Sequence, residues 1–211
     1  MSKARAKKIK LLLFDVDGVL TDGTIWLFPA PAGFEPMTAE KKAAEHAHIG
    51  GYSISGSSMM EAKGFNAHDG TAISLARLGG LKTGLITKRI SETVALRAKD
   101  LRLDHVYQGI ADKLGSFREI LAKEKLEASE AAFVGDDIID LPVMRNCGLA
   151  IAVPNGREDV KQEAHLITKR VGGDGALRDA VEYILSAQGK LQAVIDEYIQ
   201  ERKVKNAKVS D

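Results

Sequence analysis

The first strong pattern in the chain is an almost unbroken apolar run, residues 9–14, that ends at a pair of aspartates. Six residues are too few to cross a membrane, and the run lacks the alternation of a half-exposed strand. It therefore predicts a strand that is buried on both faces, at the centre of a parallel sheet. Asp15 and Asp17 would then lie at the carboxyl end of that strand, which is the edge where open α/β sheets bind ligands.

From about residue 66 onward, short apolar runs alternate with segments of helical period. Strands are predicted at residues 82–86, 105–107, 131–134 and 149–153, and helices at 91–101, 112–125, 141–146 and 176–185. Such alternation is typical of βαβ units with right-handed crossovers around a parallel sheet. The predicted fold class is therefore α/β, with a doubly wound parallel sheet.

Residues 24–65 do not follow this alternation of strands and helices. A β-rich segment at 24–28 is followed by several prolines, and residues 59–65 can pair back as a further strand. We predict a β-hairpin flap that projects from the sheet edge, with an insertion at about 29–50 in its turn. A short helix is predicted at 39–48, with Thr38 as its N-cap. Residues 1–190 would form one domain, and residues 191–211 a terminal helix and tail.

Composition narrows the class of protein. At 211 residues the chain can form one sizeable domain. Its 30 basic and 29 acidic residues give a net charge of +1, which does not favour a nucleic-acid or membrane partner. The single cysteine, Cys147, excludes an intramolecular disulfide and suits a reducing compartment. We expect a cytoplasmic protein, since the first apolar run is also too short for a secretory signal.

Polar groups follow four of the predicted elements in turn. They are Asp15 with Asp17, then Thr87, then Lys113 at the start of a helix, and finally the cluster Asp136, Asp137 and Asp140 after Gly135. Taken singly, each has an ordinary explanation as a turn, a β-former, a solvated charge or a helix cap. Their repeated position at strand ends favours a shared site instead.

These residue types match the needs of phosphoryl transfer. That reaction uses a nucleophile, a hard cation, donors to the phosphoryl oxygens, and an acid for the departing alcohol. Two aspartates two positions apart on extended backbone share a face, and they repel unless a cation or proton lies between them. Oxygen ligands favour a hard ion, so the pattern predicts Mg²⁺ as the cofactor.

The same residues resemble a known superfamily. Asp15-x-Asp17-Gly, Thr87, Lys113 and Gly135-Asp136-Asp137-x-x-Asp140 are similar to the four motifs of the haloacid dehalogenase phosphatases. Residues 65–70, 86–89, 107–109, 140–144 and 172–178 resemble the 3-deoxy-D-manno-octulosonate 8-phosphate phosphatase subfamily. The resemblance covers about residues 9–190 apart from the insertion. It implies a Rossmann-like core with a flap and no large cap domain.

The resemblance also implies a covalent mechanism. Asp15 would attack phosphorus to give an aspartyl-phosphate, and Asp17 would protonate the sugar oxygen and later activate water. Thr87 and Lys113 would hold the phosphoryl oxygens. Mg²⁺ would be held by the acidic motif positions: Asp15, Asp17 through its backbone carbonyl, Asp136 and Asp140, with Asp137 in support.

Matching positions in the subfamily give a candidate sugar site. It comprises Asn66, Ala67, His68, Asp69, Gly70, Arg89 and Arg97, together with Lys113. An arginine suits the carboxylate of a keto-sugar acid because it can donate two parallel hydrogen bonds. The implied substrate is 3-deoxy-D-manno-octulosonate 8-phosphate, a small sugar phosphate of a lipopolysaccharide pathway. The implied assembly is a homotetramer in which flaps screen neighbouring sites, with residues 172–178 closing over the site.

Several departures from the subfamily pattern leave alternatives open. His68 and Ser74 stand where arginine is usual, and Lys88 replaces a glycine. A phosphatase for a related nine-carbon sugar-acid 9-phosphate, or one of broader specificity, therefore stays open. So do the role of the insertion and the size of the oligomer. A non-catalytic regulatory oligomer is disfavoured, because every motif carboxylate is present.

Overall fold

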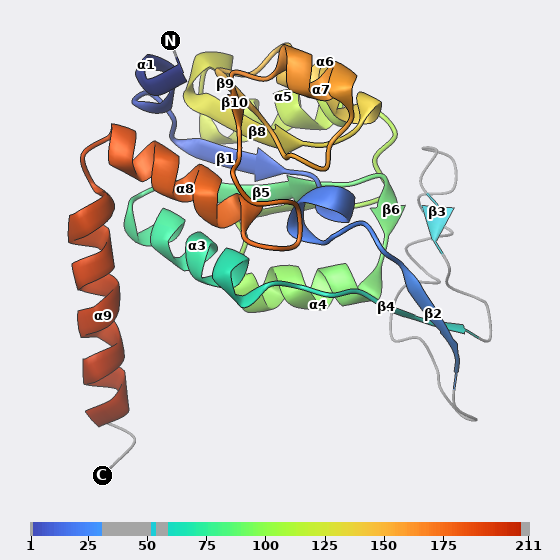
Figure 1. The fold of residues 1–211 in the computed structure, drawn as a ribbon, viewed down its shortest axis with the longest axis horizontal. Helices are drawn as coiled ribbons and strands as arrows, with labels where there is room; N and C mark the ends of the chain where they lie inside the picture. The colour runs from blue at the N-terminus through green and yellow to red at the C-terminus, as the bar shows by residue number, and fades with distance from the viewer. Residues whose placement is uncertain (1, 31–51, 54–58, 208–211) are drawn as a thin grey trace.

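A computed structural model describes residues 2–30, 52–53 and 59–207. Its centre is a parallel sheet of six strands in the order β10-β9-β8-β1-β5-β7, with helices on both faces (Figure 1). This confirms the predicted doubly wound α/β fold. The helix predicted at residues 39–48 lies outside the described residues.

The elements have the following bounds. The strands are β1 (Leu11–Phe14), β2 (Trp26–Pro29), β3 (Tyr52–Ser53), β4 (Met59–Ala62), β5 (Lys82–Ile86), β6 (Arg89–Ile90), β7 (His105–Tyr107), β8 (Ala131–Gly135), β9 (Leu149–Ala152) and β10 (Leu166–Ile167). The α-helices are α1 (Ser2–Ala6), α3 (Ala67–Leu78), α4 (Glu92–Leu101), α5 (Lys113–Glu124), α6 (Leu141–Met144), α7 (Glu158–Glu163), α8 (Ala176–Ala187) and α9 (Leu191–Ala207). Short helical turns are η1 (Val16–Leu20), η3 (Ala128–Glu130) and η4 (Ile138–Asp140). The sequence pattern did not identify α3, α7 or β10.

The core has two layers because β1 is apolar on both faces. Leu12 and Phe14 pack in one layer with residues of α3, α4 and α8. Leu11 and Leu13 point the opposite way and pack with residues of α5, α6 and α7. Successive side chains of a strand alternate between faces, so a continuous apolar run fills both layers at once. The burial of all four residues of β1 follows directly from that run.

The order of strands places β1 at the switch point of the sheet. Phe14 lies opposite Leu85 of β5 on one side and Val134 of β8 on the other. The three strands are parallel, so their carboxyl ends reach the same edge. The residues that follow them, including Asp15, Thr87 and Asp136, are therefore gathered at the edge where such sheets bind ligands.

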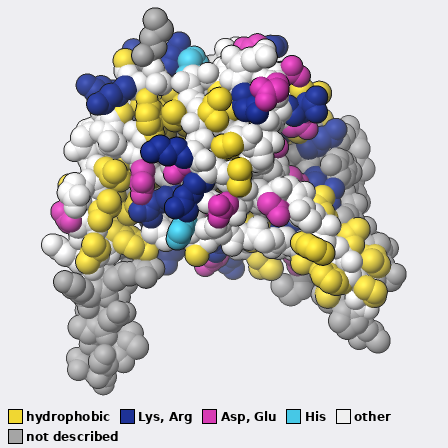
Figure 2. All heavy atoms as spheres, in the orientation of Figure 1, with side chains coloured by type: hydrophobic (Ala, Val, Ile, Leu, Met, Phe, Trp, Pro, Cys, Tyr) yellow, Lys and Arg dark blue, Asp and Glu magenta, His cyan; other side chains and the backbone are white. Residues whose placement is uncertain are grey.

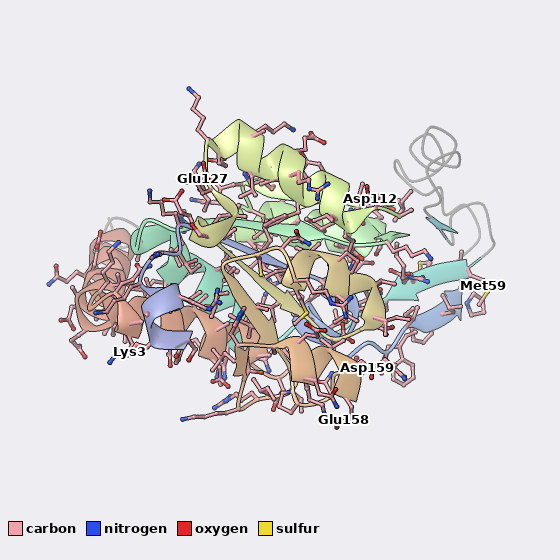
Figure 3. All side chains as sticks on the ribbon, turned by 90° about the horizontal axis from the view of Figure 1, so that it is seen from above. Lys3, Met59, Asp112, Glu127, Glu158 and Asp159 are labelled. Atoms are coloured by element: carbon pink, nitrogen blue, oxygen red, sulfur yellow. The ribbon has the colours of Figure 1, made fainter. Side chains whose placement is uncertain are left out.

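The predicted flap is present as an antiparallel ladder. Trp26 lies opposite Ala62, and Pro29 opposite Met59. The ladder projects beyond the carboxyl edge of the sheet (Figures 1 and 3), and the label of Met59 marks its outer end. β3 pairs in parallel with β6, a contact that the sequence pattern did not predict. Within the described residues there is no large cap domain.

Two apolar features lie outside the sheet layers. Trp26, Leu27 and Phe28 of β2 are 58%, 46% and 46% exposed, and an apolar group is visible at the flap in Figure 2. α9 runs away from the body of the molecule in Figure 1, while Leu191 and Ile195 pack against the core. Among the described helices, none combines the length and apolarity needed to cross a bilayer.

Candidate active site

The centre of the site is an ion pair between Asp15 and Lys113. Asp15 follows β1 and is only 4% exposed. Its Oδ1 accepts the N–H of Val16 at 2.7 Å, and its Oδ2 lies 2.9 Å from Lys113 Nζ. Lys113 is the first residue of α5, whose N-cap Asp112 is labelled in Figure 3. The start of this helix thus brings a buried cation to the end of the central strand.

Asp140 fixes Lys113 from the other side. Its Oδ1 lies 2.7 Å from Lys113 Nζ. Its Oδ2 accepts the N–H of Asp136 at 3.0 Å and that of Asp137 at 3.3 Å. Both oxygens of this fully buried carboxylate are therefore engaged with protein groups. Asp140 ties the lysine to the turn that carries Asp136.

Asp136 completes a cluster of three carboxylates. One oxygen from each of Asp15, Asp136 and Asp140 lies within 4.8 Å of the others. Asp136 Oδ1 is buried and has no hydrogen-bond partner among the residues that the structure describes. Gly18 has a φ of +91°, and a Cβ there would lie 2.2 Å from Asp136 Oδ2. The glycine lets the carboxylate approach the loop after β1, and the unpaired oxygen needs a partner that the described residues do not supply.

The charges in the cluster are poorly balanced. Burial raises the pKa of Asp15 to about 7, with Asp140 adding to the rise and Lys113 opposing it. Burial also raises the pKa of Asp136 to about 8, and repulsion from Asp15 and Asp140 contributes. Burial acts to lower the pKa of Lys113, but attraction to Asp15 and Asp140 outweighs it and raises that pKa. One lysine does not compensate for three carboxylates, so an all-oxygen site for a hard divalent cation fits these residues.

Thr87 lies at the same sheet edge, directly after β5. It is almost fully buried, its N–H donates to the carbonyl of Tyr107 at 2.9 Å, and its carbonyl accepts the N–H of Ile110 at 3.0 Å. These bonds fix the backbone of Thr87 between β5 and the loop after β7. The hydroxyl is therefore carried by a rigid strand end next to β1.

Asp17 faces the flap. It forms an ion pair with Lys63, and its Oδ2 lies 3.6 Å from Arg89 Nε. Sequence reasoning identified Asp17 and Arg89 but missed Lys63 and its neighbour Glu61. The signal was present, because Glu61 of the otherwise apolar β4 and Lys63 just after it are opposite charges two positions apart, a spacing that puts both on one face of extended backbone.

The predicted sugar-binding segment forms the start of α3. Asn66 is the N-cap, accepting the N–H of His68 at 2.7 Å, and its amide lies 3.3 Å from Asp174. His68 is exposed, with Nδ1 3.1 Å from Arg170. Asp69 is buried and accepts the N–H groups of Gly175 and Arg178, both at 3.1 Å. Burial raises the pKa of Asp69, whose oxygens thus join α3 to α8.

The remaining predicted positions lie between α3 and α4. Arg97 of α4 lies over the Phe65 ring, 5.6 Å from its centroid, and 2.6 Å from Asp100. A Cβ on Gly70 would lie 2.7 Å from the Arg97 guanidinium. Ala67 is exposed at the first position of α3. Arg97 is therefore held in the α3–α4 interface, and it has an acidic partner on its own helix.

Residues 171–175 form a loop packed against η1. The Asn155 side chain joins the two, because Nδ2 donates to the Gly18 carbonyl at 3.0 Å and Oδ1 accepts the Gly172 N–H at 2.7 Å. A Cβ on Gly172 would lie 1.7 Å from the Gly18 carbonyl oxygen. Sequence reasoning identified this loop but missed Asn155, because Asn-Gly after a strand is an ordinary turn signal.

Comparison with known proteins agrees with this geometry. The profile of the haloacid dehalogenase-like hydrolases matches residues 85–178. The 3-deoxy-D-manno-octulosonate 8-phosphate phosphatase of Yersinia pestis is 34% identical over 188 residues, or 89% of this chain and 86% of that protein. The same enzyme from Escherichia coli K12 is 35% identical over 89% of this chain and 85% of that protein.

One solved structure is directly informative about the site. The 3-deoxy-D-manno-octulosonate 8-phosphate phosphatase of Moraxella catarrhalis was crystallised with a magnesium ion, a phosphate ion and KDO. It superimposes with a TM-score of 0.76 and is 33% identical, covering 93% of this chain and 97% of that one. The ligands of that relative are of the kinds that the carboxylate cluster and Lys113 can hold.

Proposed function

Since this chain belongs to the haloacid dehalogenase-like hydrolases, and among them to the 3-deoxy-D-manno-octulosonate 8-phosphate phosphatases, we propose that it hydrolyses that sugar phosphate with Mg²⁺. The observation that carries the proposal is the buried Asp15 carboxylate, held 2.9 Å from Lys113 at the end of the central strand. Beside it lies an Asp136 oxygen that has no partner among the described residues. A fixed nucleophile and oxygen ligands for a hard cation are two of the parts that phosphoryl transfer to a carboxylate requires.

Asp15 acts as the nucleophile. Its carboxylate oxygen forms a bond to phosphorus while the bond from phosphorus to the sugar oxygen breaks, which leaves an aspartyl-phosphate. Lys113 and Thr87 bind the phosphoryl oxygens, and Lys113 offsets part of their negative charge. Because Asp140 holds the ammonium at 2.7 Å, the lysine keeps its position while the charge on Asp15 changes.

Asp17 transfers the protons. It gives a proton to the departing sugar oxygen, and it then takes one from the water that attacks the aspartyl-phosphate. That second step releases inorganic phosphate and restores the Asp15 carboxylate. Asp17 suits both steps because it lies two residues from the nucleophile, and its side chain is 23% exposed.

Mg²⁺ would be held by Asp15 and Asp136, with the Asp17 backbone carbonyl, and it would neutralise charge on the phosphoryl oxygens. The orphaned Asp136 oxygen and the raised pKa values of Asp15 and Asp136 support this assignment. Asp140 lies in the same cluster, but its oxygens already bind Lys113 and two backbone N–H groups. Its part in holding the ion is therefore to orient Lys113 and Asp136.

The substrate is assigned from the relatives and from the charge around Asp17. Arg89 lies beside Asp17 at the flap side of the site, where an arginine can bind a sugar-acid carboxylate. At the start of α3, Asn66 lies 3.3 Å from Asp174 and His68 lies 3.1 Å from Arg170. The exposed His68 replaces a more basic residue, which favours testing the nine-carbon sugar-acid 9-phosphate as the competing substrate.

We further propose that the protein is a cytoplasmic homotetramer assembled through its flaps. Support for the assembly comes from the exposed apolar side chains of Trp26, Leu27 and Phe28 on β2, since large apolar patches mark interaction sites. Support for the compartment comes from the one cysteine, Cys147, which is buried and cannot form an intramolecular disulfide.

A substrate panel tests the proposed function. We expect kcat/KM with Mg²⁺ to be at least about tenfold higher for 3-deoxy-D-manno-octulosonate 8-phosphate than for a neutral sugar phosphate such as glucose 6-phosphate, because the neutral sugar leaves the carboxylate-binding groups unpaired. A higher value for the nine-carbon 9-phosphate would transfer the assignment to that substrate. A flat profile would contradict specificity for a sugar acid, and inactivity on every ester would contradict a phosphatase.

A further inference from the structure

Lys63 is a buried cation that the mechanism has not used. It follows β4 of the flap, and its side chain is 0% exposed although its backbone reaches the surface. Its ammonium group pairs with Asp17 Oδ1 and lies 3.9 Å from Glu61 Oε1. A buried ammonium needs close anionic partners to offset its desolvation, and Asp17 is the closer of the two.

Glu61 anchors this lysine to the body of the protein. Its Oε2 lies 2.9 Å from the Arg89 guanidinium, and its Oε1 accepts the Ser91 hydroxyl. The Thr93 hydroxyl donates to its backbone carbonyl at 3.2 Å. Ser91 and Thr93 belong to the start of α4, so this helix start fixes the position of Glu61. Lys63 and Arg89 are both held by this one carboxylate.

Both basic groups face the Asp17 carboxylate, one at each oxygen. Lys63 binds Oδ1, and Arg89 lies 3.6 Å from Oδ2. An aspartate side chain turns about two bonds, and a general acid works only within hydrogen-bond reach of the atom that it protonates. A carboxylate bound at one oxygen by a buried lysine cannot turn away from the phosphoryl site without breaking that pair.

We propose that Lys63 is a positioning residue that holds Asp17 for proton transfer to the departing sugar oxygen, with Glu61 fixing Lys63 in turn. The inference rests on the proposed function, since it assigns a role within that reaction. Lys63 does not act as a ligand for the sugar, because its side chain is buried and its nearest groups are carboxylates. The flap therefore contributes to chemistry within its own subunit.

The dependence of rate on the leaving group tests this role. kcat/KM reports the steps up to departure of the alcohol, and p-nitrophenolate departs without needing a proton whereas an alkoxide needs one. In Lys63→Met we expect kcat/KM for the sugar-acid phosphate to fall at least about tenfold more than kcat/KM for p-nitrophenyl phosphate. A loss of equal size on both esters, or no loss, would overturn the positioning role.

Two further variants make the test independent of stability. Lys82→Met is the matched control, because Lys82 also pairs with an aspartate, Asp104, but at the amino end of β5, away from the site. In this control, the ratio of kcat/KM for the sugar-acid phosphate to kcat/KM for p-nitrophenyl phosphate is expected to equal that of the wild type. Glu61→Gln leaves the lysine in place and removes its anchor, and we expect a smaller shift of the ratio in the same direction. If circular dichroism shows Lys63→Met to be unfolded, an unchanged ratio in Glu61→Gln overturns the inference.

The wild-type enzyme separates the two hypotheses. Activity on p-nitrophenyl phosphate and a simple primary alkyl phosphate, without activity on the sugar-acid phosphate, contradicts the proposed substrate only. The leaving-group comparison is then made with the alkyl ester and still decides the role of Lys63. A wild-type enzyme without activity on any ester overturns both.

Discussion

At the scale of single residues, the site depends on one lysine placed among three carboxylates. Lys113 contacts Asp15 and Asp140 at 2.9 and 2.7 Å, but Asp136 keeps an oxygen without a partner among the described residues. Burial makes this imbalance costly, because charges removed from water are stabilised only by close counter-charges. Changes at these residues should therefore affect the stability of the fold as well as the chemistry.

Removing the nucleophile gives the simplest prediction. In Asp15→Asn we expect kcat to fall by more than about 10³-fold, because an amide oxygen cannot form the aspartyl-phosphate. The measurement is steady-state release of inorganic phosphate. Asp196→Asn, on the exposed surface of α9, is the control and should leave kcat unchanged. Near-full activity in Asp15→Asn would contradict covalent catalysis.

Gly18 allows a second prediction, with Gly80 as a matched control. Both glycines have positive φ, +91° and +81°, but a Cβ at Gly18 would lie 2.2 Å from Asp136 Oδ2, whereas a Cβ at Gly80 meets no described atom within 4 Å. Each alanine variant should lose about 1–2 kcal/mol of unfolding free energy from backbone strain. We expect only Gly18→Ala to weaken Mg²⁺ binding as well, measured by calorimetry. Equal Mg²⁺ affinities in the two variants would show that Asp136 accommodates the methyl group without moving.

At the scale of elements, three parallel strands bring distant residues to one edge, and this could be predicted. The apolar run before Asp15 predicted the central strand, and the strands before Thr87 and Asp136 were predicted in the same way. Contacts made by short or polar segments could not be predicted, because such segments carry no apolar run. The β3–β6 pair has two residues on each side, and Lys63 acquires its role only when the flap folds back towards Asp17.

The carboxylates gathered at the strand ends also determine how the stability of the folded protein depends on pH. The pKa values of Asp15 and Asp136 are raised to about 7 and about 8 in the folded protein, so it holds protons that the unfolded chain releases near pH 4. The stabilisation that these two carboxyl groups contribute to the metal-free protein is therefore fully present below about pH 4 and is lost as pH rises through about 7 to 8. We expect its melting temperature in EDTA to fall between about pH 5.5 and 8.5.

Added Mg²⁺ should reduce this dependence, since the ion replaces the protons in neutralising the cluster. Differential scanning fluorimetry across the pH range, with EDTA or with Mg²⁺, makes the comparison. Asp136→Asn in EDTA is the control, and its melting temperature should vary less with pH than that of the wild type. Identical pH profiles with and without the ion would contradict a metal site at Asp136.

At the scale of the whole molecule, the flap leaves an apolar surface that the monomer does not cover. We expect light scattering with size-exclusion chromatography to give a tetramer for the wild type, and smaller species for Trp26→Glu, because a charge would be buried in the assembly. Ile167→Glu is the control, since Ile167 is a similarly exposed residue on β10, an edge strand of the six-stranded sheet, to which the flap does not belong. A monomeric wild type would contradict assembly through the flaps.

The carboxamide of Asn155 has a consequence for the ageing of the protein. It bridges η1 and the loop at 171–175. The next residue is Gly156, which has no side chain to hinder its own backbone nitrogen from attacking the Asn155 carboxamide, the first step of deamidation. Deamidation there would place a carboxylate oxygen where an amide now donates to the Gly18 carbonyl, and two acceptors would then face each other. Slow chemical damage at one surface turn would thereby loosen the backbone that carries Asp15 and Asp17.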